Sequence, residues 1–272
     1  MTDATDADDD RDEPTGRTVL VSRDGDLATL TLNRPDRANT LNEQLHDELR
    51  AGFLELANDD AVRAIILTAN GRHFCGGADL RARRTRPPVN YYFGLDYDWV
   101  PKPVIAAING AAMGGGCELA LSCDFRFISS TAQIGLTEIR FGALPAGGGT
   151  ARLPRIVGLA NAKRLIYTGQ PVDADEALRI GLVDRVSEPD ELLGEATRFA
   201  SELAVNAPYA LRTAKTLLNQ SLDLDLHHAM DLERKMIAKM ATRDEMAAAR
   251  AEASERMSTY ANIFAKPDED QA

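Results

Sequence analysis

An internal repeat is the feature that most constrains how this chain can fold. Apolar runs at residues 63–69 (RAIILTA) and 103–108 (PVIAAI) both end in an Asn-Gly pair. The segments that follow, GRHFCGGADL at 71–80 and GAAMGGGCEL at 110–119, align with each other at an offset of 39 residues. Repeats of this length are typical of stacked supersecondary units, in which each unit covers the apolar face of the next. We therefore predict a spiral of strand and helix turns.

The N-terminal part predicts a hairpin followed by a helix. Two β-rich runs at 18–23 and 27–33 are joined through an Asp-Gly pair, a strong hairpin signal. Thr40 and Glu43 have the spacing of a capping box, and apolar residues then recur at helical spacing. Folded structure is expected from about residue 17.

From about residue 173 the pattern becomes mainly helical. Helices are expected at 173–180, 189–205, 208–220 and 224 to about 262, and the remaining strand signal lies at 182–186. The helix at 189–205 has one apolar stripe. We expect this region to pack on the core or on a partner subunit.

Charge and cysteine spacing exclude several classes of function. The formal net charge is -11, but residues 1–13 hold seven acids against one arginine, which predicts a solvated, disordered tail. A nucleic-acid partner is not expected, because phosphate binding needs a broad basic face. The absence of a signal-peptide pattern or a long apolar run predicts a cytoplasmic protein outside the membrane. Cys75, Cys117 and Cys123 lack metal-site spacing, so neither a metal nor a disulfide framework is expected.

The two glycine-rich loops after the twin strands are the first candidates for chemistry. In FCGGADL (74–80) and MGGGCEL (113–119), glycine lets the backbone approach a ligand, and a helix N-terminus adds free N–H groups. Two such loops facing one point would form an oxyanion hole for the charge that develops on a carbonyl oxygen. The alternative is that the glycines serve only tight turns and close packing.

Glu118 and Glu138 are the candidate acid and base. Glu118 lies in the helix that the second loop opens, and Glu138 lies in a largely apolar stretch 20 residues further on. Paired carboxylates near an apolar pocket suit general acid and base catalysis. The alternative is a pair of structural ion pairs. The histidines His46, His73, His227 and His228 are scattered, and no motif of a serine hydrolase, a P-loop or a zinc protease is present.

Five segments carry a resemblance to a known family: NRPDRANTLN (33–42), FCGGADL (74–80), KPVIAAINGAAMGGGCELALSCD (102–124), AQIGLTEIRFGALPAGGGTARLPRIVG (132–158) and EALRIGLVDRV (176–186). On these segments the chain resembles the enoyl-CoA hydratase/isomerase, or crotonase, family across residues 17–265. The resemblance implies an α/β fold, a crotonase-like spiral of ββα units with a helical C-terminal trimerisation region. The implied division is a disordered acidic tail (1–16), a thioester-binding catalytic core (17–190), a helical oligomerisation region (191–265) and a second tail (266–272).

The resemblance also implies a site. The backbone N–H groups of Ala78 and Gly115 would form the oxyanion hole, and Glu118 and Glu138 match the two glutamates that bind water in true hydratases. Isomerases of the family typically keep only the acid at position 138, so the presence of both favours hydration. The residues implied to bind the coenzyme A thioester are Arg37, Ala38, Ala78, Asp79, Leu80, Arg81 and Gly115.

The function implied by the resemblance is that of an enoyl-CoA hydratase, a lyase of fatty acid and lipid metabolism. It would add water in the syn sense to a 2-enoyl-CoA thioester, with no metal and no cofactor beyond the coenzyme A of the substrate. A homotrimer or homohexamer is expected. The alternatives are an enoyl-CoA isomerase, a carnitinyl-type dehydratase, an aromatic acyl-CoA hydratase-lyase and a non-catalytic acyl-CoA-binding homologue.

Two clusters follow the first glycine-rich loop. Four arginines suit the phosphates of coenzyme A or form a solvated basic loop: Arg81, Arg83, Arg84 and Arg86. A group of aromatic residues would wall an acyl pocket or pack in the core: Tyr91, Tyr92, Phe93, Tyr97 and Trp99.

Overall fold

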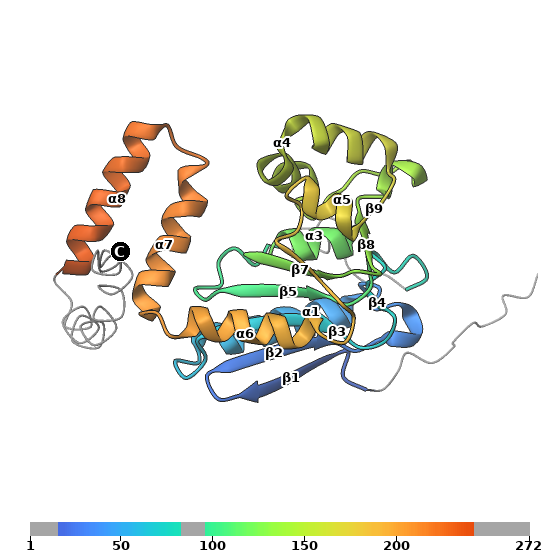
Figure 1. Ribbon diagram of the computed structural model, residues 1–272, viewed down its shortest axis with the longest axis horizontal. Coiled ribbons are helices and arrows are strands. Elements are labelled where there is room, and N and C mark those ends of the chain that lie inside the picture. Colours follow the sequence, from blue (N-terminus) through green and yellow to red (C-terminus); the bar gives the residue numbers. More distant parts are fainter. Residues whose placement is uncertain (1–15, 83–95, 242–272) are drawn as a thin grey trace, which may run out of the picture.

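Two sheets form the centre of the protein in the computed structural model, which describes residues 16–82 and 96–241 (Figure 1). The larger sheet has the order β1 (Val19–Asp24), β2 (Leu27–Leu32), β3 (Ala64–Ala69), β5 (Val104–Ile108), β7 (Phe125–Ser129) and β10 (Arg185–Ser187). The smaller has the order β4 (His73–Cys75), β6 (Ala111–Met113), β8 (Gln133–Gly135) and β9 (Val172–Asp173). Strand pairs β1–β2 and β8–β9 are antiparallel, and the other pairs are parallel.

The sequence repeat corresponds to successive turns of a spiral, which confirms the predicted fold. β3 pairs in parallel with β5, and Ile65 lies opposite Val104, its equivalent in the second repeat. The hydroxyl of Thr68 donates to the carbonyl of Ala107, 39 residues further on, at 3.0 Å. Each turn then crosses to the smaller sheet, where β4 pairs with β6 and β6 with β8. The offset of the repeat is thus the register between β3 and β5.

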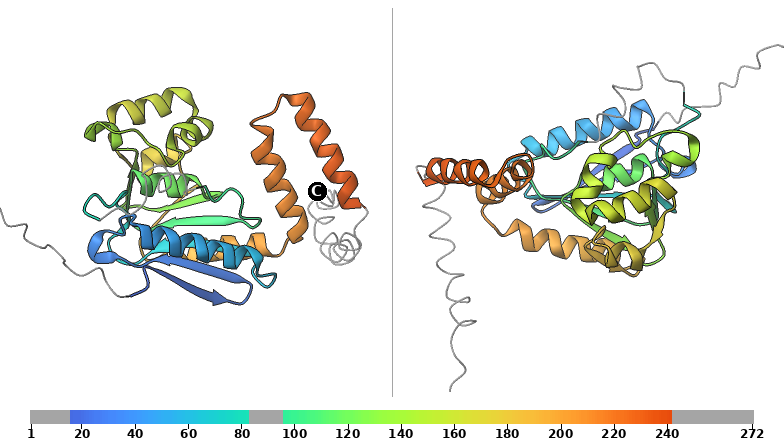
Figure 2. Two further views of the ribbon diagram at one scale, coloured as in Figure 1. Left: turned by 180° about the vertical axis from the view of Figure 1, so that it is seen from behind. Right: turned by 90° about the horizontal axis from the view of Figure 1, so that it is seen from above.

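Helices α1 (Glu43–Asn58) and α6 (Leu192–Ala204) cover opposite faces of the larger sheet (Figure 2). All residues of β3 are buried, which is typical of a strand covered on both faces. Ile65 and Leu67 pack in the cluster that contains α1, whereas Ala64 and Ile66 pack in the cluster that contains α6. The apolar stripe predicted at 189–205 is therefore buried on the sheet of its own chain.

The predicted capping box at the start of α1 is wrong. The N-cap is Asn42, whose side-chain oxygen accepts a hydrogen bond from the N–H of Leu45 at 2.9 Å. The Thr40 hydroxyl instead donates to the carbonyl of Arg37 at 2.9 Å. The chain makes a short 3-10 helix, η1 (Pro35–Arg37), before α1, so Thr40 belongs to that turn. Asparagine is as good an N-cap as threonine.

The sequence reasoning missed the longest helix of the described residues, α4 (Gly149–Thr168). Its helical pattern is interrupted by Pro154 and by Gly158, which has a φ of 75°. α4 packs on α3 (Gly115–Leu121) and on the short helix η2 (Glu138–Phe141). It therefore covers the two elements that carry the candidate glutamates. Further along, α5 (Ala174–Arg179) is confirmed, and the predicted strand at 182–186 is observed as β10.

α7 (Pro208–Ser221) and α8 (Leu226–Ala241) form a helical hairpin beside the sheets (Figures 1 and 2). The ion pairs Lys215–Asp124, at 2.7 Å, and Arg155–Asp223, at 3.5 Å, link the α7 side of this hairpin to the core. Large apolar side chains remain exposed on and between the two helices: Leu218, Leu222, Leu224, Leu226, Met230 and Ile237. The predicted helix beyond residue 241 and most of both tails lie outside the described residues.

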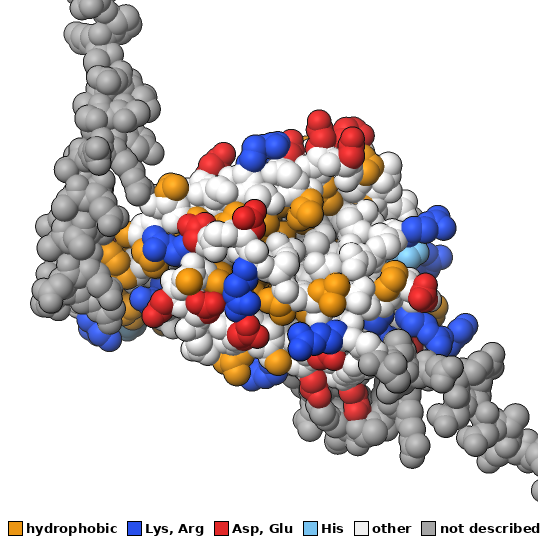
Figure 3. Space-filling view, turned by 90° about the horizontal axis from the view of Figure 1, so that it is seen from below, with side chains coloured by type: hydrophobic (Ala, Val, Ile, Leu, Met, Phe, Trp, Pro, Cys, Tyr) orange, Lys and Arg blue, Asp and Glu red, His pale blue; other side chains and the backbone are white. Residues whose placement is uncertain are grey.

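Charges of both signs are interspersed on the face shown in Figure 3. The coloured side chains of this face form no continuous basic surface of the kind that binds a phosphate backbone. Among the described helices, none has the length and apolar character that a membrane span requires.

Candidate active site

The structure brings the two glycine-rich loops together. A Cβ atom placed on Gly115 would lie 3.8 Å from the amide nitrogen of Ala78, and one placed on Gly77 would lie 3.4 Å from the nitrogen of Gly115. Gly115 is the first residue of α3, so its N–H has no acceptor within the helix. Neither amide donates a hydrogen bond to another described residue. The two candidate oxyanion-hole donors are therefore neighbours, and both are available to a ligand.

The loop around Ala78 is fixed by the segment before α1. Leu41 donates from its N–H to the carbonyl of Gly77 at 2.8 Å and accepts from the N–H of Asp79 at 3.0 Å. These two bonds flank Ala78 and leave its own N–H unused. Gly77 has a φ of 94°, and a side chain there would approach the carbonyl oxygen of Met113 to 2.8 Å. Glycine at 77 is thus required both by the backbone conformation and by the close approach of the second loop.

Glu118 is almost completely buried, and its carboxylate is held by backbone amides. Oε1 accepts hydrogen bonds from the N–H groups of Gly147, at 2.7 Å, and Gly149, at 2.8 Å. Gly149 is the first residue of α4, so this oxygen caps the N-terminus of a long helix. The helix dipole and the two donors both favour a negative charge there.

Glu138 has a different environment. It begins η2, and its Oε1 would lie 3.1 Å from a Cβ atom placed on Gly114, the N-cap of α3. Its Oε2 is buried and has no hydrogen-bond partner among the described residues. A buried, unpartnered carboxyl oxygen favours the protonated form of the group, because that form carries no charge.

The electrostatics follow from these contacts. Burial raises the pKa of Glu118 to about 7, and the charge of Glu138 raises it as well, whereas the N–H groups of Gly149 and Gly147 and the charge of Arg152 lower it. Burial also raises the pKa of Glu138 above its ordinary value. The two carboxyl groups therefore interact, and Glu118 titrates near neutrality, as a general acid or base must.

Arg34 is a residue that sequence reasoning missed. Its side chain is buried, donating from Nη1 to the carbonyl of Thr40 and from Nη2 to Oδ2 of Asp79 at 3.1 Å. Asp79 also accepts from the N–H of Arg81 at 3.1 Å, so it is a structural anchor of the loop that follows Ala78. Arg34 lies in the NRPDRANTLN segment that carries the family resemblance, but no pattern in the sequence indicated that its side chain reaches Asp79.

The other predicted substrate-binding residues lie beside the first loop. Ala38 accepts a hydrogen bond from the N–H of Gly76 at 2.9 Å, and Arg37, Leu80 and Arg81 are exposed. Of the aromatic cluster, Tyr97 is a core residue whose ring packs on Phe53, with centroids 4.1 Å apart, and Trp99 is partly exposed. The other members of the arginine cluster and of the aromatic cluster lie outside the described residues: Arg83, Arg84, Arg86, Tyr91, Tyr92 and Phe93.

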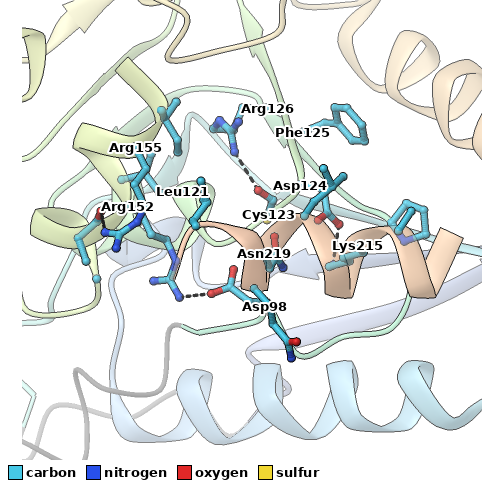
Figure 4. Close-up of a pocket in the computed structure, with 18 of the residues that line it drawn as sticks. Asp98, Leu121, Cys123, Asp124, Phe125, Arg126, Arg152, Arg155, Lys215 and Asn219 are labelled. Atoms are coloured by element: carbon cyan, nitrogen blue, oxygen red, sulfur yellow. Dashed lines mark hydrogen bonds and ion pairs between the residues drawn. The ribbon is translucent and has the colours of Figure 1, made fainter. Parts of the chain in front are cut away.

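A pocket of about 830 Å³ lies behind the loop that holds Glu118 (Figure 4). Its lining includes Gly148 and Arg152 near the start of α4, Leu121 and Cys123 at the end of α3, and residues of α7. The walls are mainly apolar, and the charged side chains labelled around it are paired, as in Arg152–Asp98 and Lys215–Asp124.

Comparison with known proteins shows the family. The model of the enoyl-CoA hydratase/isomerase family matches residues 22–261. A short-chain-enoyl-CoA hydratase of Clostridium acetobutylicum is 41% identical over 79% of this chain and 86% of its own length. A crotonyl-CoA hydratase of Syntrophomonas wolfei is 39% identical with the same coverage of both chains.

Solved structures of similar proteins support the same family. An enoyl-CoA hydratase from Bacillus anthracis superposes with a TM-score of 0.82 at 35% identity, covering 88% of this chain and 96% of the other. The chain therefore belongs to the enoyl-CoA hydratase/isomerase family, and the fold expected from the resemblance is confirmed.

Proposed function

We propose that this protein is an enoyl-CoA hydratase that adds water across the double bond of a short-chain 2-enoyl-CoA thioester. The observation that carries the proposal is the placement of two carboxyl groups, Glu118 and Glu138, in opposite environments beside two free backbone N–H groups. The relatives named short-chain-enoyl-CoA hydratase and crotonyl-CoA hydratase support the substrate class.

The two N–H groups would stabilise the charge that develops on the thioester oxygen. When a hydroxyl group adds to Cβ, the electrons of the double bond move onto the carbonyl oxygen. The amides of Ala78 and Gly115 lie close together and have no other acceptor among the described residues, so no hydrogen bond would have to break for them to bind this oxygen.

The glutamates would divide the proton transfers between them. Glu118, whose anion is stabilised by Gly147 and Gly149, takes a proton from water as the water oxygen bonds to Cβ. Glu138, whose buried carboxyl favours the neutral form, gives a proton to Cα. Both groups lie on one side of the substrate in this scheme, which accounts for syn addition. Because the two interact, their pKa values belong to the pair.

Arg37, Ala38, Leu80 and Arg81 are the proposed contacts of the coenzyme A moiety, because they flank the loop that carries Ala78. We propose a homotrimer, or a hexamer of two trimers, built through α7 and α8. The exposed apolar side chains of these helices support this assembly. We also propose that the protein is cytoplasmic and that its reaction needs no metal and no cofactor beyond the coenzyme A of the substrate.

The test is a screen of the purified protein against short, long and aromatic 2-enoyl-CoA thioesters, following the absorbance of the conjugated thioester. Loss of this absorbance with formation of the 3-hydroxyacyl product is expected with the short substrates. Isomerisation of 3-enoyl-CoA without hydration, cleavage of an aromatic product, or binding without turnover would each replace the proposal by the corresponding alternative.

A further inference from the structure

We propose that Arg152, held in place by Asp98, is a positioning residue that fixes the 147–149 loop against the carboxylate of Glu118. This inference rests on the proposed function, in which Glu118 takes the proton from water. Neither residue touches the substrate in this proposal. They act through the backbone amides that bind Glu118.

Arg152 lies directly on this loop. Its Nη1 donates to the carbonyl of Gly147 at 3.1 Å, and the N–H of the same residue donates to Glu118. A Cβ atom on Gly148, which has a φ of 105°, would clash with Nη1 of Arg152. The guanidinium group thus occupies the space where position 148 would carry a side chain, and it binds the loop through the carbonyl of Gly147.

Asp98 holds the other end of the guanidinium group. Nη2 of Arg152 donates to Oδ2 of Asp98 at 2.6 Å (Figure 4). Asp98 lies in a turn closed by a 3.0 Å hydrogen bond from the N–H of Val100 to the carbonyl of Tyr97, and the side chains of Tyr97 and Val100 are fully buried. The carboxylate is therefore presented by a turn that is anchored in the core. Because Arg152 bonds to two different segments with two different nitrogens, its position is defined more tightly than that of a surface ion pair.

The charge of Arg152 also acts on Glu118. It lowers the pKa of Glu118, against the rise caused by burial and by Glu138 of η2. Cys117, next to Glu118 on α3, remains a neutral thiol, because burial raises its pKa well above the ordinary value. The positive charge of Arg152 thus favours the ionised form of Glu118. Its hydrogen bond to the loop orients the amides of Gly147 and Gly149, which stabilise the same ionised form by donating to it.

The chain provides a matched control on the same helix. Arg155 lies one turn further along α4, donates to the carbonyl of Ala151 at 2.9 Å and pairs with Asp223 at 3.5 Å. Its side chain is 47% exposed, against 18% for Arg152. Among the described residues, Arg155 makes no hydrogen bond or ion pair with the 147–149 loop or with Glu118. Arg155→Gln therefore removes an arginine from α4 without removing the proposed function of Arg152.

The experiment compares four variants with the wild type: Arg152→Gln, Arg152→Lys, Asp98→Asn and Arg155→Gln. Hydration of crotonyl-CoA is measured as a function of pH. In parallel, difference infrared spectra between each protein and the same protein carrying Glu118→Gln report the ionisation of Glu118 without any need for turnover.

We expect Arg152→Gln to lower kcat by about tenfold and to leave KM within about twofold of the wild-type value. The acidic limb of the pH–rate profile and the infrared titration of Glu118 should both move to higher pH by about half a unit or more. Arg152→Lys keeps the charge, so it should lower kcat with less effect on the titration. Asp98→Asn keeps a side-chain oxygen that can accept from Arg152 but removes the opposing negative charge, so Arg152 should stay in place and the titration should move to lower pH. Arg155→Gln should match the wild type.

Opposite shifts for Arg152→Gln and Asp98→Asn support the inference, since a merely structural defect would not change sign. If Arg152→Gln does not fold, the test is the lower kcat of Arg152→Lys at an unchanged KM, together with the shift to lower pH in Asp98→Asn. An unchanged titration of Glu118 in Arg152→Gln, or a kcat of Arg152→Lys equal to that of Arg155→Gln, would overturn the inference. A wild type that hydrates no thioester would overturn the proposed function alone, because the infrared titration still reports the effect of Arg152 on Glu118.

Discussion

Glu118 and Glu138 are close enough for the charge of Glu138 to raise the pKa of Glu118, yet the protein solvates them in opposite ways. Oε1 of Glu118 accepts two backbone hydrogen bonds, whereas Oε2 of Glu138 is buried without a partner among the described residues. This difference in hydrogen bonding is the basis of the proposed division of roles, with Glu118 as the base and Glu138 as the acid.

Replacement of either glutamate by glutamine should lower kcat by about 10²- to 10⁴-fold with thioester binding largely retained. Glutamine keeps the size and hydrogen bonding of the side chain but removes proton transfer. The double variant should lose much less than the product of the single losses, because the two groups act as a unit. Steady-state kinetics and calorimetric titration with a product analogue would measure both quantities. Near-normal hydration by Glu118→Gln together with inactive Glu138→Gln would instead favour isomerase chemistry.

Glu118 should make the free energy of unfolding depend on pH. Its folded-state pKa is raised from 4.5 to about 7, so its stabilising contribution is complete below about pH 4.5 and is lost as the pH rises through about 7. Glutamine stays neutral throughout. The stability of Glu118→Gln relative to the wild type should therefore increase between about pH 5 and about pH 8, on the order of 2 kcal/mol. Urea unfolding at several pH values would measure the difference, and a flat difference would contradict the raised pKa.

Gly149→Ala should damage the site, whereas Gly194→Ala should not. A Cβ atom at 149 would lie 2.9 Å from the side chains of Leu136 and Pro145 and 3.0 Å from Oε1 of Glu118. We expect kcat to fall by about 10- to 100-fold, because the amide that binds Glu118 must move. At 194, on α6, the nearest atom would be 3.7 Å away on the flexible side chain of Arg198, and alanine favours helix. Kinetics and melting temperatures of the two variants test this; equal behaviour would contradict it.

The exposed leucines after α7 should be part of a subunit interface. Leu222 and Leu226 are 61% and 71% exposed. Their joint replacement by aspartate should dissociate the assembly, because burying two carboxylates in an apolar contact is costly. Leu54→Asp, at an exposed leucine of α1, is the control and should leave the assembly intact. Light scattering would measure the mass, and a monomeric wild type at micromolar concentration would contradict the trimer.

The spiral could be predicted from the sequence because equivalent positions of the repeat lie side by side in the sheet. Ile65 and Val104 are equivalent in the two repeats and also adjacent in the sheet, so the offset carried real spatial information. The two glycine-rich loops follow paired strands at equivalent positions, and this explains why the loops could be predicted to face one point, whereas Ala78 and Gly115 themselves came from the family resemblance. Glu118 and Glu138 were found partly from patterning and partly from resemblance.

The remaining features depend on contacts that no local pattern encodes. The Gly147 and Gly149 amides reach Glu118 across about 30 residues of chain, and Arg34 reaches Asp79 across 45. α4 was missed because Pro154 and Gly158 interrupt its periodicity. The cap of α1 was assigned to Thr40, although Asn42, two residues further on, is also of a type that caps helices; the preceding 3-10 turn takes up Thr40 and leaves Asn42 as the cap.

The two proposed oxyanion-hole donors belong to successive turns of the spiral, and this has a consequence for biosynthesis. A growing chain presents Ala78 well before Gly115 leaves the ribosome, and the amides that hold Glu118 come later still. A thioester can therefore bind only to a chain in which the turns have already stacked, and such binding stabilises the stacked state at the expense of incomplete ones. Cellular acyl-CoA would act as a selective stabiliser of finished subunits, distinguishing them from nascent chains that are still missing the second donor.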